Sequence, residues 1–172
     1  MIRFSVIPKL LASAACVIFM TAPGFAQAPK LIGEFNDWAA YTFSGKKGAV
    51  CYIVSQPKET SPKNVKRDPI HFLVTHRPSE KVRGEVNTII GYPFKKGSTA
   101  KLTIDGSGFT LFTSGDGAWA DTSNNDQRIV SAMKAGSKMV VEGVSWRGTK
   151  TVDRYSLSGV TAALDKIAGS CQ

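Results

Sequence analysis

The chain has 172 residues, of which 42% are hydrophobic and 20% are charged. This balance excludes an intrinsically disordered polypeptide, because there is enough apolar material to build a core. Lys and Arg number 22 against 13 Asp and Glu, which gives a net charge of +9. A surplus of this size favours anionic partners, such as a charged membrane surface, lipopolysaccharide, glycans or nucleic acid.

The first 26 residues have the pattern of a secretory signal peptide. Arg3 and Lys9 form a basic start, residues 10–20 form an apolar run, and residues 21–26 end on small side chains. A membrane span needs roughly 20 apolar residues, so we expect cleavage and a mature chain, residues 27–172, that has no transmembrane segment. We expect this chain to be a single domain of the periplasm, the outer membrane or the medium. Such a location argues against a nucleic-acid partner.

Two of the three cysteines remain after cleavage. Cys16 lies in the apolar run and lacks the large aliphatic residue that lipidation requires three places before it, so we expect it to leave with the signal. An even number of cysteines in an exported chain favours a disulfide. We therefore predict a bond between Cys51 and Cys171, which closes a loop of 120 residues.

Most of the mature sequence consists of short segments rich in β-branched and aromatic residues, separated by turn residues. The expected strands are residues 34–43, 50–55, 70–75, 85–90, 101–104, 109–113, 117–121, 138–146 and 149–157. The short connections at residues 105–108 and 147–148 predict hairpins. Regularly spaced strands of this kind predict an all-β sandwich or barrel.

Two segments have helical periodicity. Residues 127–135 predict a helix that ends at Gly136. Its expected N-cap is one of three polar residues, Asn124, Asn125 or Asp126. A second helix is expected to begin after Ser158 as its N-cap and to stop at Gly169, with one apolar face lying on the sheet.

The chain offers no catalytic or metal-binding motif. His71 and His76 are five residues apart, so a strand running through both places them on opposite faces, where they cannot share a metal. We expect one of them to be half-buried and the other exposed. No HExxH, paired CxxC, calcium-loop or G-x-S-x-G motif occurs, so we assign no catalytic residue, no metal and no cofactor. A scattered Ser-His-Asp triad stays open as an alternative, because it needs no local motif.

The segment from position 58 to position 101 is strongly basic, with ten Lys and Arg against four acidic residues. If the loops at residues 58–67, 77–83 and 95–96 converge at one end of a sandwich, their cations form a patch that binds an anion. The cations assigned to this patch are Lys58, Lys63, Lys66, Arg67, Lys81, Arg83, Lys95 and Lys96. The alternative is a scatter of charges that keeps an exported protein soluble.

The tryptophans and one long loop leave two further choices open. Trp38, Trp119 and Trp146 can serve as carbohydrate platforms, but such residues are more often part of the core of a small sandwich, and we expect the core. Residues 56–68 hold two prolines and four basic residues. We expect a loop there, either a binding loop or a plain solvated excursion.

A series of short motifs occurs in a fixed order between positions 85 and 172. They are Gly91-Tyr92-Pro93, Gly117-Ala118-Trp119-Ala120, Ala132-Met133-Lys134-Ala135-Gly136, Met139-Val140-Val141, Ser145-Trp146-Arg147-Gly148-Thr149, Asp153-Arg154-Tyr155-Ser156-Leu157, Gly159-Val160-Thr161-Ala162-Ala163-Leu164 and Cys171. This series resembles the invasion-associated locus B family of exported bacterial proteins. The part before it agrees more loosely, with Trp38 ahead of Cys51, and Val160 stands where an aromatic residue is expected.

The resemblance implies an immunoglobulin-like β-sandwich, a cell-envelope or secreted location, and a link to host association or invasion. It implies no catalytic residue. With the pattern above, we expect an all-β domain with two short helices and one disulfide. We expect it to act as a non-enzymatic protein that binds an anionic envelope or host-surface component. Two alternatives stay open: an envelope assembly factor that pairs a sheet edge with a partner chain, and a periplasmic hydrolase with a scattered site.

Overall fold

The computed structural model describes residues 28–172. The predicted signal peptide, residues 1–26, lies outside this part of the chain, as does Cys16. In residues 28–172, no helix is long and apolar enough to cross a membrane.

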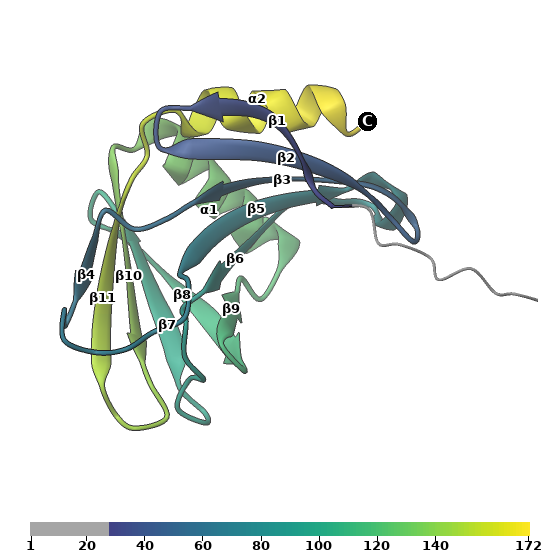
Figure 1. Cartoon of the computed structure of the whole chain (residues 1–172). Helices are drawn as coiled ribbons and strands as arrows, with labels where there is room; N and C mark the ends of the chain where they lie inside the picture. The colour runs from purple at the N-terminus through teal and green to yellow at the C-terminus, as the bar shows by residue number, and fades with distance from the viewer. Residues whose placement is uncertain (1–27) are drawn as a thin grey trace, which may run out of the picture.

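Eleven strands form one antiparallel sheet that folds into two halves (Figure 1). The strands are β1 (Lys30–Phe35), β2 (Trp38–Gly45), β3 (Gly48–Ser55), β4 (Glu59–Ser61), β5 (His71–Arg77), β6 (Val82–Ile89), β7 (Thr99–Ile104), β8 (Ser107–Ser114), β9 (Gly117–Trp119), β10 (Lys138–Val144) and β11 (Lys150–Ser156). Their order in the sheet is β1-β2-β3-β5-β6-β9-β8-β7-β10-β11-β4. The first half holds β1, β2, β3, β5 and β6, and the other strands fan downward as the second half (Figure 1).

The apolar sides of the two halves meet in a common core. Side chains alternate between the two faces of a strand, so Phe72 and Val74 of β5 are fully buried at 0% exposure, whereas Leu73 between them is half-buried. Phe72 meets Tyr155 of β11 with ring centroids 5.8 Å apart. Trp38 on β2 donates from Nε1 to the Ser156 carbonyl of β11. These contacts join the two halves, and the predicted all-β sandwich with two short helices is confirmed.

The first helix, α1 (Ser123–Ala135), packs on β6. It begins four residues earlier than predicted, because its N-cap is Thr122, whose Oγ1 accepts a hydrogen bond from the Asn125 backbone N at 3.2 Å. The three polar residues expected as caps, Asn124, Asn125 and Asp126, therefore lie inside the first turn. The helix ends at Gly136 as predicted.

The second helix, α2 (Val160–Ser170), lies along β1 and β2 (Figure 1). Its N-cap is Gly159, not Ser158, whose hydroxyl instead accepts from Asn36 Nδ2 at 3.0 Å. Gly159 has a φ of +90°, and a Cβ there would clash with the Phe35 carbonyl, so glycine is required. The helix also continues through Gly169, which therefore does not act as the stop that the sequence predicts.

The end of α2 is bonded to the sheet. Cys171 follows the helix directly, and its disulfide to Cys51 of β3 joins Cα atoms 5.9 Å apart. Both cysteines are buried, with exposed fractions of 1% and 0%. The predicted Cys51–Cys171 pair is confirmed.

Candidate functional site

A groove lies where three segments far apart in the sequence meet: the loop before β5, the turn after β6, and the loop between β10 and β11. Its volume is about 750 Å³, within the usual range for small-molecule sites. The lining residues are Asn64, Val65, Lys66, Arg67, Asp68, Gly91, Tyr92, Pro93, Ser145, Trp146, Arg147, Thr149 and Thr151. We call this the basic groove.

Backbone hydrogen bonds hold the three segments together. Asp68 N donates to the Gly91 carbonyl at 3.0 Å, and Trp146 N donates to the Pro93 carbonyl at 2.9 Å. Gly91 has a φ of +76°, and a side chain there would clash with the Asp68 carbonyl. Only glycine permits this close approach, which explains a glycine at the start of the Gly91-Tyr92-Pro93 motif.

The floor of the basic groove is a buried ion pair. The Arg67 Nη1 and Nη2 atoms donate to the Asp153 Oδ1 and Oδ2 atoms, both at 2.6 Å. The side chains are 6% and 0% exposed. Arg67 also donates from Nε and Nη2 to the Ile90 carbonyl, at 3.0 and 2.6 Å. A bidentate pair with these extra bonds holds the loop before β5 against β11.

Tyr92 completes the floor. Its ring lies under the Arg67 guanidinium, with Cζ 5.0 Å from the ring centroid, and its hydroxyl shares a 2.6 Å hydrogen bond with Thr151 Oγ1. Burial raises the pKa of the Tyr92 hydroxyl above its ordinary value. The polar groups of the floor are therefore bonded to one another and do not offer an ionised base to the groove.

The rim differs from the floor because its charges are exposed. Trp146 is 59% exposed. The guanidinium carbon of Arg147, Cζ, lies 4.8 Å from the ring centroid of Trp146. Lys66 and Arg147 are exposed, and Asp68 is the one acidic residue of the lining. An exposed indole beside two cations can stack on a ring and attract an anion at the same place.

The structure divides the eight predicted cations into separate groups. Lys66 and Arg67 line the basic groove, and Lys63 belongs to the same loop. Lys95 and Lys96 follow the turn after β6, where Lys95 N donates to the Val144 carbonyl beside the β10–β11 loop. Lys63, Lys66, Lys95 and Lys96 are exposed, and Lys66 is the one of these four that lines the groove, whereas Arg67 is buried in its floor.

The other three predicted cations lie elsewhere. Lys58 pairs with Asp37 at a second hollow, on the outer side of β2 and β3. Lys81 and Arg83 lie at the start of β6, and Lys95 lies beyond its end. Since a strand rises about 3.3 Å per residue, the eight residues of β6 place Lys81 roughly 25 Å from the groove.

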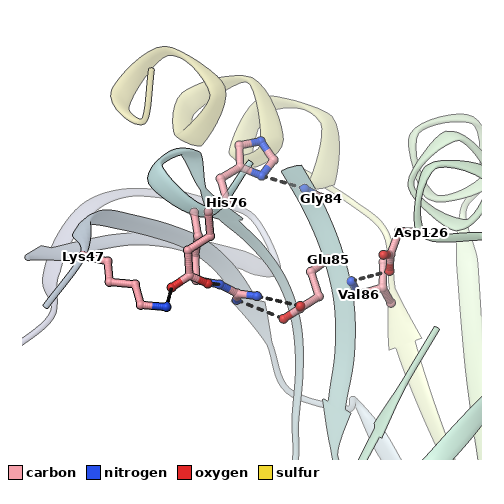
Figure 2. A network of polar contacts seen from close by, with 8 residues as sticks. Lys47, His76, Gly84, Glu85, Val86 and Asp126 are labelled. Carbon is pink, nitrogen blue, oxygen red and sulfur yellow. Dashed lines mark hydrogen bonds and ion pairs between the residues drawn. The ribbon is translucent and has the colours of Figure 1, made fainter. Parts of the chain in front are cut away.

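Figure 2 shows the polar network at that far end of β6. Arg77 donates to Glu85 through both Nη atoms, at 3.0 and 2.7 Å, and to Glu80 through Nε at 3.1 Å. Lys47 lies 3.4 Å from Glu80. Hydrogen bonds from Arg77 and Lys47 hold the pKa of Glu80 below its ordinary value. Within this network the two cations, Lys47 and Arg77, are matched by two carboxylates, Glu80 and Glu85.

The histidines occupy opposite sides of β5, as predicted, but neither is exposed. His71 is half-buried beside the second hollow. His76 is 9% exposed, and its Nδ1 accepts from Gly84 N at 3.0 Å (Figure 2). The expectation of one exposed histidine is therefore wrong, because His76 lies on the buried side of β5 and is hydrogen-bonded to the neighbouring strand β6. Among residues 28–172, no cluster of His, Cys, Asp or Glu could hold a metal ion.

The tryptophans also differ from expectation. Trp38 is in the core at 1% exposure, but Trp119 is half-buried and Trp146 is 59% exposed. The expectation of a core position is wrong for Trp119, which stacks on the exposed ring of Phe112. It is also wrong for Trp146, because β10 turns Met139 and Val141 inward and residue 146 has the opposite parity. The alternation of inward and outward residues along β10 predicts that Trp146 points outward. This alternation, together with the neighbouring cation Arg147, is the sequence signal that could have placed Trp146 and Arg147 at the site.

Comparisons with known proteins fit this architecture. The family model for "Invasion associated locus B (IalB) protein" matches residues 38–168, as the resemblance implied. The crystal structure of invasion associated protein B from Bartonella henselae is similar, with a TM-score of 0.55 and 15% sequence identity over 85% of this chain and 100% of that chain. No curated protein matches the chain. The solved structure shows a shared fold, and the family match spans more than half of the sequence, so the chain belongs to the invasion associated locus B family.

Proposed function

We propose that this protein is an exported, non-enzymatic component of the cell envelope or the medium. Its mature chain, residues 27–172, binds an anionic component of the envelope or of a host surface through the basic groove. The main support for this proposal is the exposed pair of Trp146 and Arg147, which stack on each other and line the groove together with Lys66. The sequence of the first 26 residues supports export.

The charges near the groove support an anionic ligand. Within residues 28–172, none of the cations Lys63, Lys66, Lys95, Lys96 and Arg147 has a carboxylate within 4.0 Å, whereas Lys47, Lys58, Lys101 and Lys134 each have one. Unpaired exposed cations around a concave surface raise the local concentration of anions. Other exposed cations of the described chain, Lys81 and Arg83 among them, are unpaired as well, but at the groove Lys66 and Arg147 outnumber Asp68, the one acidic residue of the lining.

The floor of the groove supports binding over catalysis. A general base must exchange a proton with its substrate, and Asp153 is fully buried and bonded through both oxygens to Arg67. Tyr92 is bonded to Thr151. These groups hold the groove in shape, and the exposed rim is left to make the contacts with a ligand.

A link to host association is part of the same proposal. The matching family and the similar protein from Bartonella henselae are both named as invasion associated. Host surfaces and bacterial envelopes both carry anionic glycans and lipids, so one basic groove suits either partner.

The proposal is tested with the mature chain on two anionic probes, immobilised heparin and phosphatidylglycerol vesicles, over a series of salt concentrations. The double variant Lys66→Gln/Arg147→Gln removes two cations of the groove. The variant Lys81→Gln/Arg83→Gln removes the same charge at the far end of β6. Two exposed charge contacts contribute up to about 1 kcal/mol each, so we expect the groove variant to bind roughly tenfold more weakly and the control to bind like wild type. Equal affinity of the two variants would refute the groove as the site.

A further inference from the structure

Trp146 is an exposed aromatic residue at a position where the fold does not need one. It lies in the loop between β10 and β11, at the lower end of the second half (Figure 1). Trp146 N donates to the Pro93 carbonyl at 2.9 Å, and Gly148 N donates to the Ser145 carbonyl at 2.7 Å. These main-chain bonds do not depend on the indole, and Trp146 is 59% exposed. A large apolar ring in contact with water at this place therefore points to a ligand.

The indole of Trp146 combines a stacking surface with a neighbouring cation. Trp146 lines the basic groove, and the Arg147 guanidinium lies over its ring, 4.8 Å from the centroid. The face of an aromatic ring is electron-rich and attracts groups with partial positive charge. The C–H groups on one side of a pyranose ring are of this kind, so an exposed indole can stack on a sugar. An acidic substituent of that sugar then lies close to the guanidinium.

Other polar residues of the groove match the hydroxyl groups of a sugar. Asn64 and Asp68 are exposed and Thr149 is half-buried, and all three line the groove. An amide both donates and accepts hydrogen bonds, a hydroxyl does the same, and a carboxylate accepts them. A sugar hydroxyl can bond to each of these groups. A bare sulfate ion only accepts, so Asp68 repels it, and the lining therefore favours an anion that is attached to a hydroxyl-bearing ring.

The shape and the floor of the groove favour a glycan over a lipid surface. The groove is a concave space of about 750 Å³, whereas a membrane is broad and meets side chains that protrude. The floor consists of the Arg67–Asp153 ion pair and the hydrogen bond between Tyr92 and Thr151, so it offers no apolar recess to an acyl chain. A pocket with one aromatic wall and a few placed polar groups suits a small number of sugar rings.

We propose that the ligand of the basic groove is an acidic glycan. One sugar ring stacks on Trp146, its hydroxyls bond to the polar groups of the wall, and its sulfate, carboxylate or phosphate group pairs with Lys66 and Arg147. This inference rests on the proposed function and narrows its ligand to a carbohydrate that carries negative charge. The bacterial envelope and the host surface both supply such glycans.

Isothermal titration calorimetry of the mature chain tests the glycan with four probes. A heparin tetrasaccharide represents the host surface, and the delipidated core oligosaccharide of lipopolysaccharide represents the envelope. Pyrophosphate supplies charge without a sugar, and phosphatidylglycerol vesicles supply an anionic lipid surface. Trp146→Ala removes the ring, and Trp146→Phe keeps a smaller one. Phe112→Ala is the matched control, because Phe112 is 47% exposed and is not part of the groove lining.

We expect at least one of the two oligosaccharides to bind, and to bind about tenfold or more tightly than pyrophosphate does. Trp146→Ala should weaken this binding by about tenfold or more, Trp146→Phe by about threefold or less, and Phe112→Ala should leave it unchanged. Salt screens ion pairs but not stacking, so the ratio of the wild-type affinity to the Trp146→Ala affinity should be the same at low and at high salt. Circular dichroism verifies folding, and Trp146→Gln takes the place of Trp146→Ala if the latter does not fold.

The failure of this inference is distinguishable from the failure of the proposed function. If Lys66→Gln/Arg147→Gln weakens oligosaccharide binding and Trp146→Ala does not, the sugar stack is overturned and the anion-binding groove remains. If neither variant changes the affinity, the groove is not the site and both proposals are overturned. Absence of binding to both oligosaccharides overturns the glycan, and binding to phosphatidylglycerol vesicles in that case assigns the ligand to a lipid surface.

Discussion

Arg67 shows how far a side chain can depart from what its neighbours in sequence suggest. It belongs to a loop with two exposed lysines, Lys63 and Lys66, yet its guanidinium is 6% exposed and bonded to Asp153, 86 residues later. Its partner lies on β11, and no local pattern in the loop identifies it. The buried pair fixes the loop in place and thereby positions the exposed Lys66 at the groove.

Replacing Asp153 with Asn should destabilise the protein strongly. The Arg67 charge then stays buried without a counterion, and breaking one partner of a buried pair costs about 3–5 kcal/mol of unfolding free energy. Urea denaturation measures the loss. The variant Arg67→Met/Asp153→Leu removes both charges, so it should lose less unfolding free energy than Asp153→Asn does. A change below about 1 kcal/mol in Asp153→Asn would show that the ion pair does not hold the loop.

His76 makes stability depend on pH. Burial lowers its pKa below the ordinary value, and the nearby Arg83 and Lys134 act in the same direction. The unfolded chain, with a histidine pKa of about 6.5, therefore takes up a proton before the folded chain does. The unfolding free energy should be constant above about pH 7 and should fall as the pH drops from about 7 to about 5.

Urea midpoints at several pH values in this window test the role of His76. The variant His76→Asn keeps an acceptor for the Gly84 N–H group and removes the titration, so its midpoint should be nearly independent of pH. The pKa values of the carboxyl groups of Asp37 and Glu80 are lowered below their ordinary values. These two groups therefore stay ionised between about pH 7 and about pH 5. An unchanged pH slope in the variant would assign the effect to another group.

At the scale of elements, the disulfide between Cys51 of β3 and Cys171 after α2 joins an early strand to the C-terminal helix. The helix buries Val160, Leu164 and Ile167 against the sheet, and the disulfide then fixes its last turn. We expect Cys51→Ser and Cys171→Ser to lower the melting temperature equally, and the double variant to add little. In the chain-entropy model, a loop on the order of 100 residues gives about 4.7 kcal/mol. Additive losses in thermal unfolding would contradict a single shared bond.

Local sequence patterns predict the strands and helices that alternate or repeat clearly. The hairpins at residues 105–108 and 147–148 and the apolar face of α2 are of this kind. β4 (Glu59–Ser61) is polar and three residues long, and it forms because Thr60 pairs with Asp153 of β11. β1 (Lys30–Phe35) carries a register shift beside Gly33, which disturbs its alternation. Both lie at the sheet edges, where the partner strand determines the structure more than the segment does.

The candidate site follows from sequence only in part. The basic character of residues 58–101 predicts an anion site, and two of the predicted cations, Lys66 and Arg67, line one groove. The strand order of the folded sheet determines which loops lie at the same end. The sequence alone therefore does not show that Lys81 and Arg83 lie at the opposite end of β6 from Lys95. Trp146 and Arg147 lie outside that basic segment, in a hairpin loop that only the fold brings beside Lys66.

At the scale of the whole molecule, the surface divides into three regions with different chemistry. The loop end of the sandwich carries the basic groove, the outer side of β2 and β3 carries Tyr41 and Tyr52, and the outer side of β7 and β10 carries Lys101 and Glu142.

Hydrogen–deuterium exchange of the mature chain, with and without heparin oligosaccharide, is the decisive test of the basic groove as the binding site. We expect the oligosaccharide to slow exchange in residues 63–68 and 145–149, which surround the basic groove, and to leave residues 79–84 unchanged. Protection confined to the β5–β6 turn, or spread evenly over all exposed loops, would contradict an anion site in the groove.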